Sequence, residues 1–443
     1  MSEPVDPMAQ LLSLWGESAT SWIQGAQASW QQVATSFGLP SMGAQDPAHL
    51  QGLWSSLWGE YQADLGGLPA DAFTVDFAPL AAAFGASMTG TADPRQQRMV
   101  RDWTDAMAVK ARLGPEYYAD PTQTPVRPTP RALVHQRNNV SLHRYQSDGP
   151  RTGEPVLIVY SVINRSYILD LCEGTSFVQH LLDAGLDVFM VEWGETVTGD
   201  RQTTLDWTVS DALDSCVSVI EELTGSSQVA LFGHCIGGTF AAMYAALHPE
   251  RVARFLALTA PFRSSDGGVV AFCANPASFP VDQVLDEHGH MPAKLIRYTF
   301  MALKPYYELM KWRMFVQTLG DEHAMARFRV IDRWANDNVD IPAEVFRPFV
   351  SEVLQSERLL DGEATLGDAR IDLGAITCPL LNVAAKDDWI VNPDGAFALR
   401  RAVPEGAYRE LLLEGGHLSL ILDPRQRERW TELSDFLLHG HGA

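Results

Sequence analysis

Short, continuous apolar runs recur along the chain from residue 131 onward, and segments with helical periodicity separate most of them. Helical periodicity is clearest at 166–184 and 206–224. Strands that are apolar on both faces and alternate with helices are typical of a parallel sheet covered by helices on both sides. The pattern therefore predicts an α/β fold. The strand-like runs lie at 155–160, 187–192, 228–232, 255–259 and 379–385, with a weaker one at 408–413.

The alternation is interrupted once, between residue 262 and about 350. No clear strand is visible there, and helical segments take its place, among them MPAKLIRYTFMALKPYYELMKW at 291–312. Strand-like runs resume at 379–385. The interruption therefore predicts a mostly helical cap at about 262–350, inserted between two strands of the sheet.

Residues 1–119 have a different texture and are rich in Trp, Ala, Gln and Ser. Apolar and aromatic positions recur there close to every 3.6 residues, which predicts amphipathic helices with a tryptophan stripe. A Pro-rich segment, DPTQTPVRPTP at 120–130, separates this helical N-terminal extension from the α/β domain at 120–443. The stripe fits two interpretations, a packed core of its own or a surface for a partner subunit or an apolar polymer.

Charge and composition argue against several kinds of partner. The chain carries 33 basic and 55 acidic residues, a net charge of −22, which repels nucleic acid and anionic membranes. No uninterrupted apolar run reaches transmembrane length, and the start, MSEPVDPMAQ, lacks the features of a signal peptide. The five cysteines are odd in number and widely spaced, which suggests neither a disulfide framework nor a zinc site. We expect a cytoplasmic protein with no membrane span.

The segment LFGHCIGGTF at 231–240 lies between an apolar run and a helical segment. A strand, a sharp turn and a helix form the nucleophile elbow, in which many hydrolases place a serine. Cys235 occupies the turn position here. Gly233, Gly237 and Gly238 supply the small neighbours that such a strained turn needs. The helix start favours negative charge, so the frame predicts a thiolate nucleophile rather than a buried structural cysteine.

A thiolate nucleophile needs a base, and the base needs an acid that orients it. His417 lies in LLLEGGHLSLI, after an apolar run and a Gly-Gly turn, where a loop histidine could reach the elbow. Two acids, Asp387 and Asp388, follow the run at 379–385. The usual pattern has a valine three residues after the acid. Val391 has that spacing from Asp388, so Asp388 is favoured and Asp387 is the alternative.

Backbone N–H groups near the nucleophile are the expected oxyanion donors. Ile236 follows Cys235 directly and is the first candidate. The second donor should come from the loop after the first strand-like run, in SVINRSY at 161–167, where Val162 is the candidate.

At this point a specific family resemblance becomes visible. Over about 125–437 the chain resembles polyhydroxyalkanoate synthases, and it is most similar to the catalytic subunits called class III. The resemblance rests on five segments, YSVINRSYILDL (160–171), VEWG (191–194), GHCIGGTFAAMYAALHPERV (233–252), MPAKLIRYTFMALKPYYELMKW (291–312) and GGHLSLI (415–421).

The resemblance implies an α/β-hydrolase fold with a mostly parallel central sheet, a helical cap and, here, an N-terminal helical extension. It also implies an acyltransferase that polymerises (R)-3-hydroxyacyl-CoA into polyester and releases coenzyme A. The family's pattern maps onto Cys235 as the carrier of the growing thioester, with Asp388 and His417 completing the triad. The coenzyme A thioester is the substrate, and no metal or redox cofactor is implied.

Two departures from the family pattern stand out. Members usually have a histidine directly after the catalytic acid, whereas this chain has Trp389. Class III catalytic subunits generally lack a long N-terminal extension and need a second subunit. Residues 1–119 could replace such a subunit or bind one, so we expect a homodimer or an assembly with a second synthase subunit, at the surface of polymer granules.

Two other functions fit parts of the sequence. A thioesterase or simple acyltransferase could use the same triad and would transfer the acyl group to water or another acceptor. A non-catalytic granule-binding protein could use the aromatic N-terminal stripe, but it would not need the triad.

Overall fold

The structure is a computed structural model of the chain. Apart from residues 93, 94 and 97, the predicted helical extension at 1–119 lies outside the described residues and stays a prediction. The structure describes residues 93–94, 97 and 126–440, with gaps at 148, 196–202, 265–267, 276–280, 283–284, 286–288, 294, 298–299, 301–317 and 319–320.

One eight-stranded sheet forms the centre of the domain, with the strand order β1-β2-β6-β3-β7-β8-β13-β14. All neighbours from β6 to β14 pair in parallel, and only β2 runs antiparallel to its neighbours, β1 and β6. The mostly parallel α/β sheet that the sequence predicts is therefore confirmed. The strands are β1 (Arg131–Arg137), β2 (Val140–Tyr145), β3 (Val156–Val159), β6 (Val188–Trp193), β7 (Val229–His234), β8 (Val252–Leu258), β13 (Leu380–Ala385) and β14 (Tyr408–Leu413).

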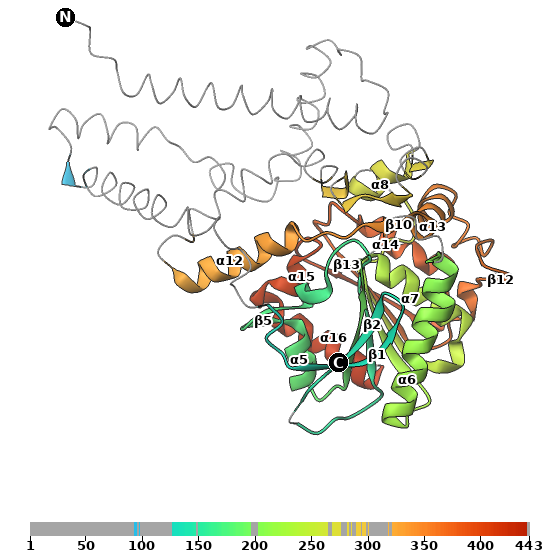
Figure 1. The fold of residues 1–443 in the computed structure, drawn as a ribbon, viewed down its shortest axis with the longest axis horizontal. Coiled ribbons are helices and arrows are strands. Elements are labelled where there is room, and N and C mark those ends of the chain that lie inside the picture. The colour runs from blue at the N-terminus through green and yellow to red at the C-terminus, as the bar shows by residue number, and fades with distance from the viewer. Residues whose placement is uncertain are drawn as a thin grey trace, which may run out of the picture. The chain divides into compact units, whose positions relative to one another are not determined.

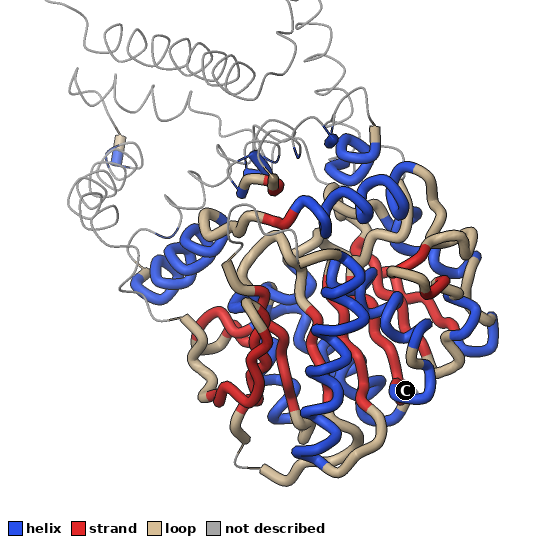
Figure 2. The backbone as a smooth tube through the Cα atoms, turned by 45° about the vertical axis from the view of Figure 1, so that its right-hand side comes forward, coloured by secondary structure: helices blue, strands red, loops and turns tan. Residues whose placement is uncertain are grey.

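Helices cover both faces of this sheet (Figure 1). On one face, α5 (Phe177–Asp183) and α16 (Arg427–His439) bury their aromatic side chains in a continuous apolar core with the strands. On the other, α6 (Asp214–Thr224) and α7 (Ile236–Leu247) pack against β7, and α7 is buried along almost its whole length. Figure 2 shows the strands running side by side between these two helical layers.

The hairpin of β1 and β2 is not visible in the hydrophobic pattern. Both strands carry polar side chains such as Arg131, His143 and Arg144, because the hairpin lies at the edge of the sheet. Its turn contains Asn138 with φ of 52°, a left-handed conformation that asparagine tolerates better than most residues.

The helical prediction at 166–184 is only partly correct. The segment begins with a short 3-10 turn, η3 (Ser166–Leu169), and two short strands, β4 (Asp170–Cys172) and β5 (Thr175–Ser176), precede α5. The strands are two or three residues long, too short to leave an alternating pattern in the sequence. The prediction at 206–224 is confirmed, since the π-helical turn η4 (Trp207–Leu213) leads directly into α6.

Between β8 and β13 the chain leaves the sheet, and the described residues of the range predicted for the cap are mostly helical (Figure 1). Most of the predicted helical segment at 291–312 lies outside the described residues. The chain between β8 and β13 also contains two pairs of two-residue strands, and the first pair lies in the range where no clear strand was predicted. Within the part of the chain that the structure describes, no helix combines the length and apolar character needed to span a bilayer. The elements are α8 (Gly268–Ala274), β9 (His290–Met291), α12 (Glu322–Ala335), β10 (Ile341–Pro342), α13 (Ala343–Pro348), the π-helical η6 (Phe349–Gln355), β11 (Thr365–Leu366), β12 (Ala369–Arg370) and η7 (Leu373–Ala375).

Short helical elements flank the last strands. They follow the two strand ends at which the sequence predicts the acid and the base. They are α14 (Pro393–Phe397), η8 (Ala398–Arg401), η9 (Glu405–Ala407), α15 (Ser419–Leu422) and η10 (Pro424–Gln426).

Candidate active site

Cys235 occupies a sharp turn between β7 and α7. Its φ of 55° and ψ of −134° lie outside the regions that ordinary residues adopt, as expected for a strained nucleophile elbow. The turn is held by backbone hydrogen bonds, from Cys235 N to Leu258 O at 3.0 Å and from Gly238 N to Cys235 O at 2.8 Å. The structure thus presents the thiol at the carboxyl edge of the sheet, with the residue only 7% exposed.

The glycines of the elbow are required by close approach of neighbouring chain segments. A Cβ on Gly237 would lie 2.2 Å from the carbonyl oxygen of Val159, and a Cβ on Gly238 would lie 2.5 Å from the Cβ of Ala260. A Cβ on Gly233 would lie 2.4 Å from the Cα of Gly238. No real side chain fits at such distances, so the tight β7–α7 turn depends on these residues.

The predicted base and acid lie next to each other in the buried site. His417 Nδ1 lies 2.6 Å from Asp388 Oδ2, and neither side chain is more than 6% exposed. The other carboxylate oxygen of Asp388 accepts hydrogen bonds from the backbone N–H groups of Ile390 (2.8 Å) and Val391 (2.9 Å). Three groups thus contact the about four lone-pair sites of the carboxylate, which fixes its orientation.

The order of the strands explains why these three residues meet. Strands β7, β8, β13 and β14 are consecutive neighbours and run in parallel. Cys235, Asp388 and His417 follow β7, β13 and β14 respectively, so all three lie at the same carboxyl edge of the sheet. The alternative acid, Asp387, is exposed, and its backbone N–H is bonded to Gly415 O at 2.9 Å. The geometry therefore favours Asp388 as the partner of His417.

The charge on His417 is set by its two neighbours. Burial lowers the pKa of His417, but the Asp388 carboxylate and the Cys235 sulfur, through charge and hydrogen bonding, raise it to about 10. Since Nδ1 is bonded to Asp388, Nε2 is the nitrogen available to Cys235. The raised pKa of His417 favours the protonated imidazolium beside Cys235.

The two predicted oxyanion donors have different surroundings. Ile236 is the first residue of α7 and lines the same cavity as Cys235. Val162 is buried in the loop after β3, and its side chain lines a separate small cavity beside Trp193. Its neighbour Ile163 lines the cavity of Cys235. The oxyanion role of the two N–H groups stays a prediction.

His234 is a site residue that the sequence analysis does not single out. Its ring stacks on Tyr160 with a centroid separation of 5.2 Å and an interplanar angle of 2°, and it meets the ring of His417 edge-on at 5.2 Å. Burial, together with the charge of His417, holds the pKa of His234 well below its ordinary value, so it is neutral. Its position directly before the nucleophile is the one signal in the sequence that indicates this proximity.

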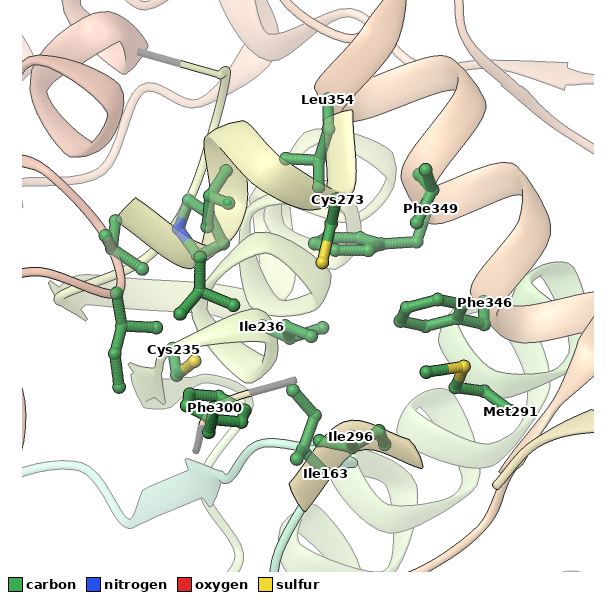
Figure 3. A pocket seen from close by; sticks show the side chains of 16 residues that line it. Ile163, Cys235, Ile236, Cys273, Met291, Ile296, Phe300, Phe346, Phe349 and Leu354 are labelled. Atoms are coloured by element: carbon green, nitrogen blue, oxygen red, sulfur yellow. The ribbon is translucent and has the colours of Figure 1, made fainter. Parts of the chain in front are cut away.

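The thiol of Cys235 opens into an apolar cavity (Figure 3). Cys273 of α8 also lines it, and burial raises the pKa of the Cys273 thiol to about 12, which keeps that thiol protonated. Trp389, at the position that differs from the family pattern, packs edge-on against the lining residue Phe300 at 5.7 Å. The lining residues are Ile163, Cys235, Ile236, Pro261, Val269, Val270, Cys273, Met291, Ile296, Phe300, Phe346, Phe349, Val350, Leu354, Ile390 and Val391.

The site offers covalent chemistry on a thiol. Among the described residues, no group of three or more His, Cys, Asp and Glu side chains could hold a metal ion. A thiolate, a base and an apolar cavity are the components of acyl transfer from an apolar acyl donor.

Comparison with known proteins places the chain among relatives. The model of the α/β hydrolase fold family matches residues 154–424. The chain is 33% identical over 309 residues to the poly(3-hydroxyalkanoate) polymerase subunit PhaC of Allochromatium vinosum, and the match covers 68% of this chain and 86% of that protein. The corresponding protein of Thiocystis violacea is 32% identical over 308 residues, with 68% and 86% covered. That of Synechocystis is 33% identical over 301 residues, with 66% and 79% covered.

Proposed function

Because the chain belongs to the family of poly(3-hydroxyalkanoate) polymerase subunits, built on the α/β-hydrolase fold, we propose that it joins 3-hydroxyacyl groups from coenzyme A thioesters into a polyester. Cys235 would carry the acyl chain, His417 would transfer protons, and Asp388 would orient His417. The observation that supports this assignment is the buried His417–Asp388 pair beside a thiol that faces an apolar cavity.

Acylation would use the charged pair of the unacylated enzyme. The Cys235 thiolate attacks the carbonyl carbon of the incoming thioester, and the bond from that carbon to the coenzyme A sulfur breaks. The departing sulfur takes the proton of the His417 imidazolium, so free coenzyme A leaves and the acyl group remains on Cys235. The N–H groups of Ile236 and Val162 would stabilise the oxyanion that forms on the carbonyl oxygen.

Elongation needs a neutral base, and acylation itself supplies one. Once Cys235 is a thioester it carries no negative charge, so one of the causes that raise the pKa of His417 is removed. Neutral His417 can then take the proton from the 3-hydroxyl of the next substrate as that oxygen attacks the Cys235 thioester. The bond to the Cys235 sulfur breaks, the thiolate–imidazolium pair returns, and the lengthened chain is taken back onto Cys235 with release of coenzyme A.

A thiol suits this reaction better than a hydroxyl. Transfer of an acyl group from one thiol to another is nearly isoergic, so the chain on Cys235 stays activated for the next bond. The described lining of the cavity consists of apolar side chains and the thiols of Cys235 and Cys273, which offer a hydrolytic water few hydrogen-bond partners. This favours transfer to the substrate hydroxyl over loss of the chain to water.

The assembly is a further part of the proposal. The relatives are named as subunits, and we infer that this chain also works in an assembly, as a homodimer or with a second subunit, at the polymer surface. Light scattering on the purified chain before and during polymer formation tests this inference. A monomer that keeps full activity throughout would contradict it.

The decisive experiment is incubation of the purified chain with 3-hydroxybutyryl-CoA. Thiol release, turbidity and the mass of the Cys235 peptide are followed together. We expect release of coenzyme A in step with insoluble polyester, and an acylated Cys235 peptide after rapid quenching. Release of coenzyme A with free 3-hydroxybutyrate and no polymer would instead identify a thioesterase and overturn the proposal.

A further inference from the structure

The turn that holds the acid also holds the cap. In the segment 388–391, the N–H groups of Ile390 and Val391 point inward and bind the Asp388 carboxylate. The carbonyl groups of the same turn point the other way. The carbonyl of Trp389 accepts a hydrogen bond from Val269 N at 3.2 Å, and that of Ile390 accepts one from Val270 N at 3.3 Å. One short turn therefore connects the acid of the triad to the first residues of α8.

This docking is possible because the first residue of α8 is glycine. Gly268 has φ of 84°, in the left-handed region that side chains rarely adopt. A Cβ at this position would lie 2.4 Å from the carbonyl oxygen of Trp389 and 3.2 Å from its carbonyl carbon. Backbone atoms cannot move aside as the end of a flexible side chain can, so any other residue would push α8 away from the turn.

The same helix and turn form part of the acyl cavity. Val269, Val270 and Cys273 of α8 line it, and so do Ile390 and Val391 of the turn. Helix α8 and the turn at 388–391 therefore pack together, and both form part of the cavity wall. Displacement of α8 would therefore also shift the turn at 388–391, which sets the position of Asp388.

We propose that Gly268 is a positioning residue for the triad. It allows α8 to dock on the carbonyl groups of Trp389 and Ile390, and this docking fixes the turn that presents Asp388 to His417. The inference rests on the proposed role of the triad, but its test below does not depend on polymer formation.

The test compares Gly268→Ala with Gly289→Ala. Gly289 also has a positive φ, 71°, but a Cβ there meets nothing within 4 Å, so the control carries the backbone strain without the collision. Alkylation of Cys235 by iodoacetamide, read by peptide mass spectrometry across pH, reports the thiolate. In Gly268→Ala, a displaced Asp388 stabilises the imidazolium less, and the imidazolium then stabilises the thiolate less. We expect half-maximal alkylation to move to higher pH, and kcat for coenzyme A release to fall about 100-fold.

Gly289→Ala should keep the alkylation profile of the natural chain. If Gly268→Ala keeps that profile as well, α8 does not position the acid, and the proposal is wrong even if activity falls. If Gly268→Ala fails to fold, Val269→Pro takes its place, because it removes the N–H donor to Trp389 in the first helical turn, where proline is tolerated. An unchanged profile in that variant would equally overturn the proposal. Alkylation needs no acyl substrate, so its outcome is independent of whether polyester is the product.

Discussion

Cys235 combines the features that a covalent acyl carrier needs. Its backbone is strained, with φ of 55°, and the turn presents the sulfur at the carboxyl edge of the sheet. Cys235 is 7% exposed and lines an apolar cavity. Cys235→Ala should therefore abolish coenzyme A release and acylation while leaving the melting temperature within a few degrees of the natural value, since only one sulfur atom at the cavity is lost. Cys235→Ser should retain a small fraction of activity at most, because a hydroxyl is ionised far less readily. Near-natural turnover by the alanine variant would rule out the thioester mechanism.

The two neighbouring aspartates provide a matched pair for testing the acid. Asp388 is buried and lies 2.6 Å from His417 Nδ1, whereas Asp387 is exposed. Asp388→Asn keeps the shape but removes the charge and favours the wrong histidine tautomer, so kcat should fall by about 10⁴-fold, as for other triad orienters. Asp387→Asn should change kcat less than about threefold, in line with the small effects of surface substitutions. The reverse order of the two effects would show that the wrong acid has been assigned.

The pKa of His417 tests the proposed ion pair between the His417 imidazolium and the Cys235 thiolate. In the natural chain its pKa is about 10, because Asp388 and Cys235 outweigh the opposing effect of burial. The folded pKa exceeds the unfolded value of about 6.5. The imidazolium therefore contributes stability in full below about pH 6.5, and this contribution is lost as the pH rises through about 10.

We expect NMR of isotope-labelled histidine to show His417 protonated well above neutral pH, and its pKa to fall in Cys235→Ala, where the negative sulfur is absent. The difference in unfolding free energy between pH 6.5 and pH 10 should shrink in the same variant. A His417 pKa near its ordinary value in the natural chain would contradict the thiolate–imidazolium pair.

At the scale of elements, the elbow depends on how closely α7 approaches the end of β8. A Cβ on Gly238 would collide with the Cβ of Ala260 at 2.5 Å. Gly238→Ala should therefore lower the free energy of unfolding by about 1–3 kcal/mol, as overpacked sites do. Ala260→Gly in the same chain removes the colliding atom and should restore part of the loss, measured by urea unfolding. No recovery in the double variant would show that another contact of Gly238, such as that with the Gly233 carbonyl, dominates.

Elements that are apolar along their whole length can be predicted from the sequence, and elements with polar or very short sequences cannot. Strands such as β3 and β7 are buried on both faces, so their continuous apolar runs predict them. The β1–β2 hairpin lies at the sheet edge with half-exposed polar side chains, and β4 and β5 have only two or three residues each. Neither kind of strand produces a periodic signal.

The site shows the same division between local and long-range information. The elbow around Cys235 is a local pattern of glycines, and Asp388 and His417 each follow a predicted strand, so all three could be proposed as site residues from the sequence. The docking of Gly268 against Trp389 joins residues that are far apart in the chain, and the stacking of His234 between Tyr160 and His417 depends on three strands meeting. Such contacts exist only once the sheet order is known.

At the scale of the whole molecule, the Pro-rich segment at 120–130 is partly built into the catalytic domain. Thr129 Oγ1 donates a hydrogen bond to the buried carboxylate of Asp170 at 2.8 Å, and the N–H of Thr129 donates another at 3.2 Å. Arg127 forms an ion pair with Glu192 at 2.7 Å, and its N–H binds the carbonyl of Asp170 at 3.0 Å. These contacts join Arg127 and Thr129 to the α/β domain.

These contacts define a matched pair of shortened chains. A chain that begins at Asp120 keeps Arg127 and Thr129, so we expect it to fold with a melting temperature close to that of the full chain. A chain that begins at Arg131 leaves the buried Asp170 without two donors and Glu192 without one cation. An unsatisfied buried group costs about 1–3 kcal/mol, so the second chain should unfold at a clearly lower temperature.

Removal of residues 1–119 alone should change the kinetics of polymerisation rather than the stability of the α/β domain. A wide aromatic face contributes most by holding apolar polymer, a partner subunit or a second copy of the chain. The chain that begins at Asp120 should therefore polymerise more slowly or after a longer lag, while its rate of Cys235 alkylation stays unchanged because the triad is intact. Turbidity, Cys235 alkylation and light scattering are measured on the full chain and on the chain that begins at Asp120. A collapsed melting temperature would show that the tryptophans belong to a core shared with the α/β domain, and unchanged lag and oligomer size would show that residues 1–119 serve neither assembly nor polymer binding.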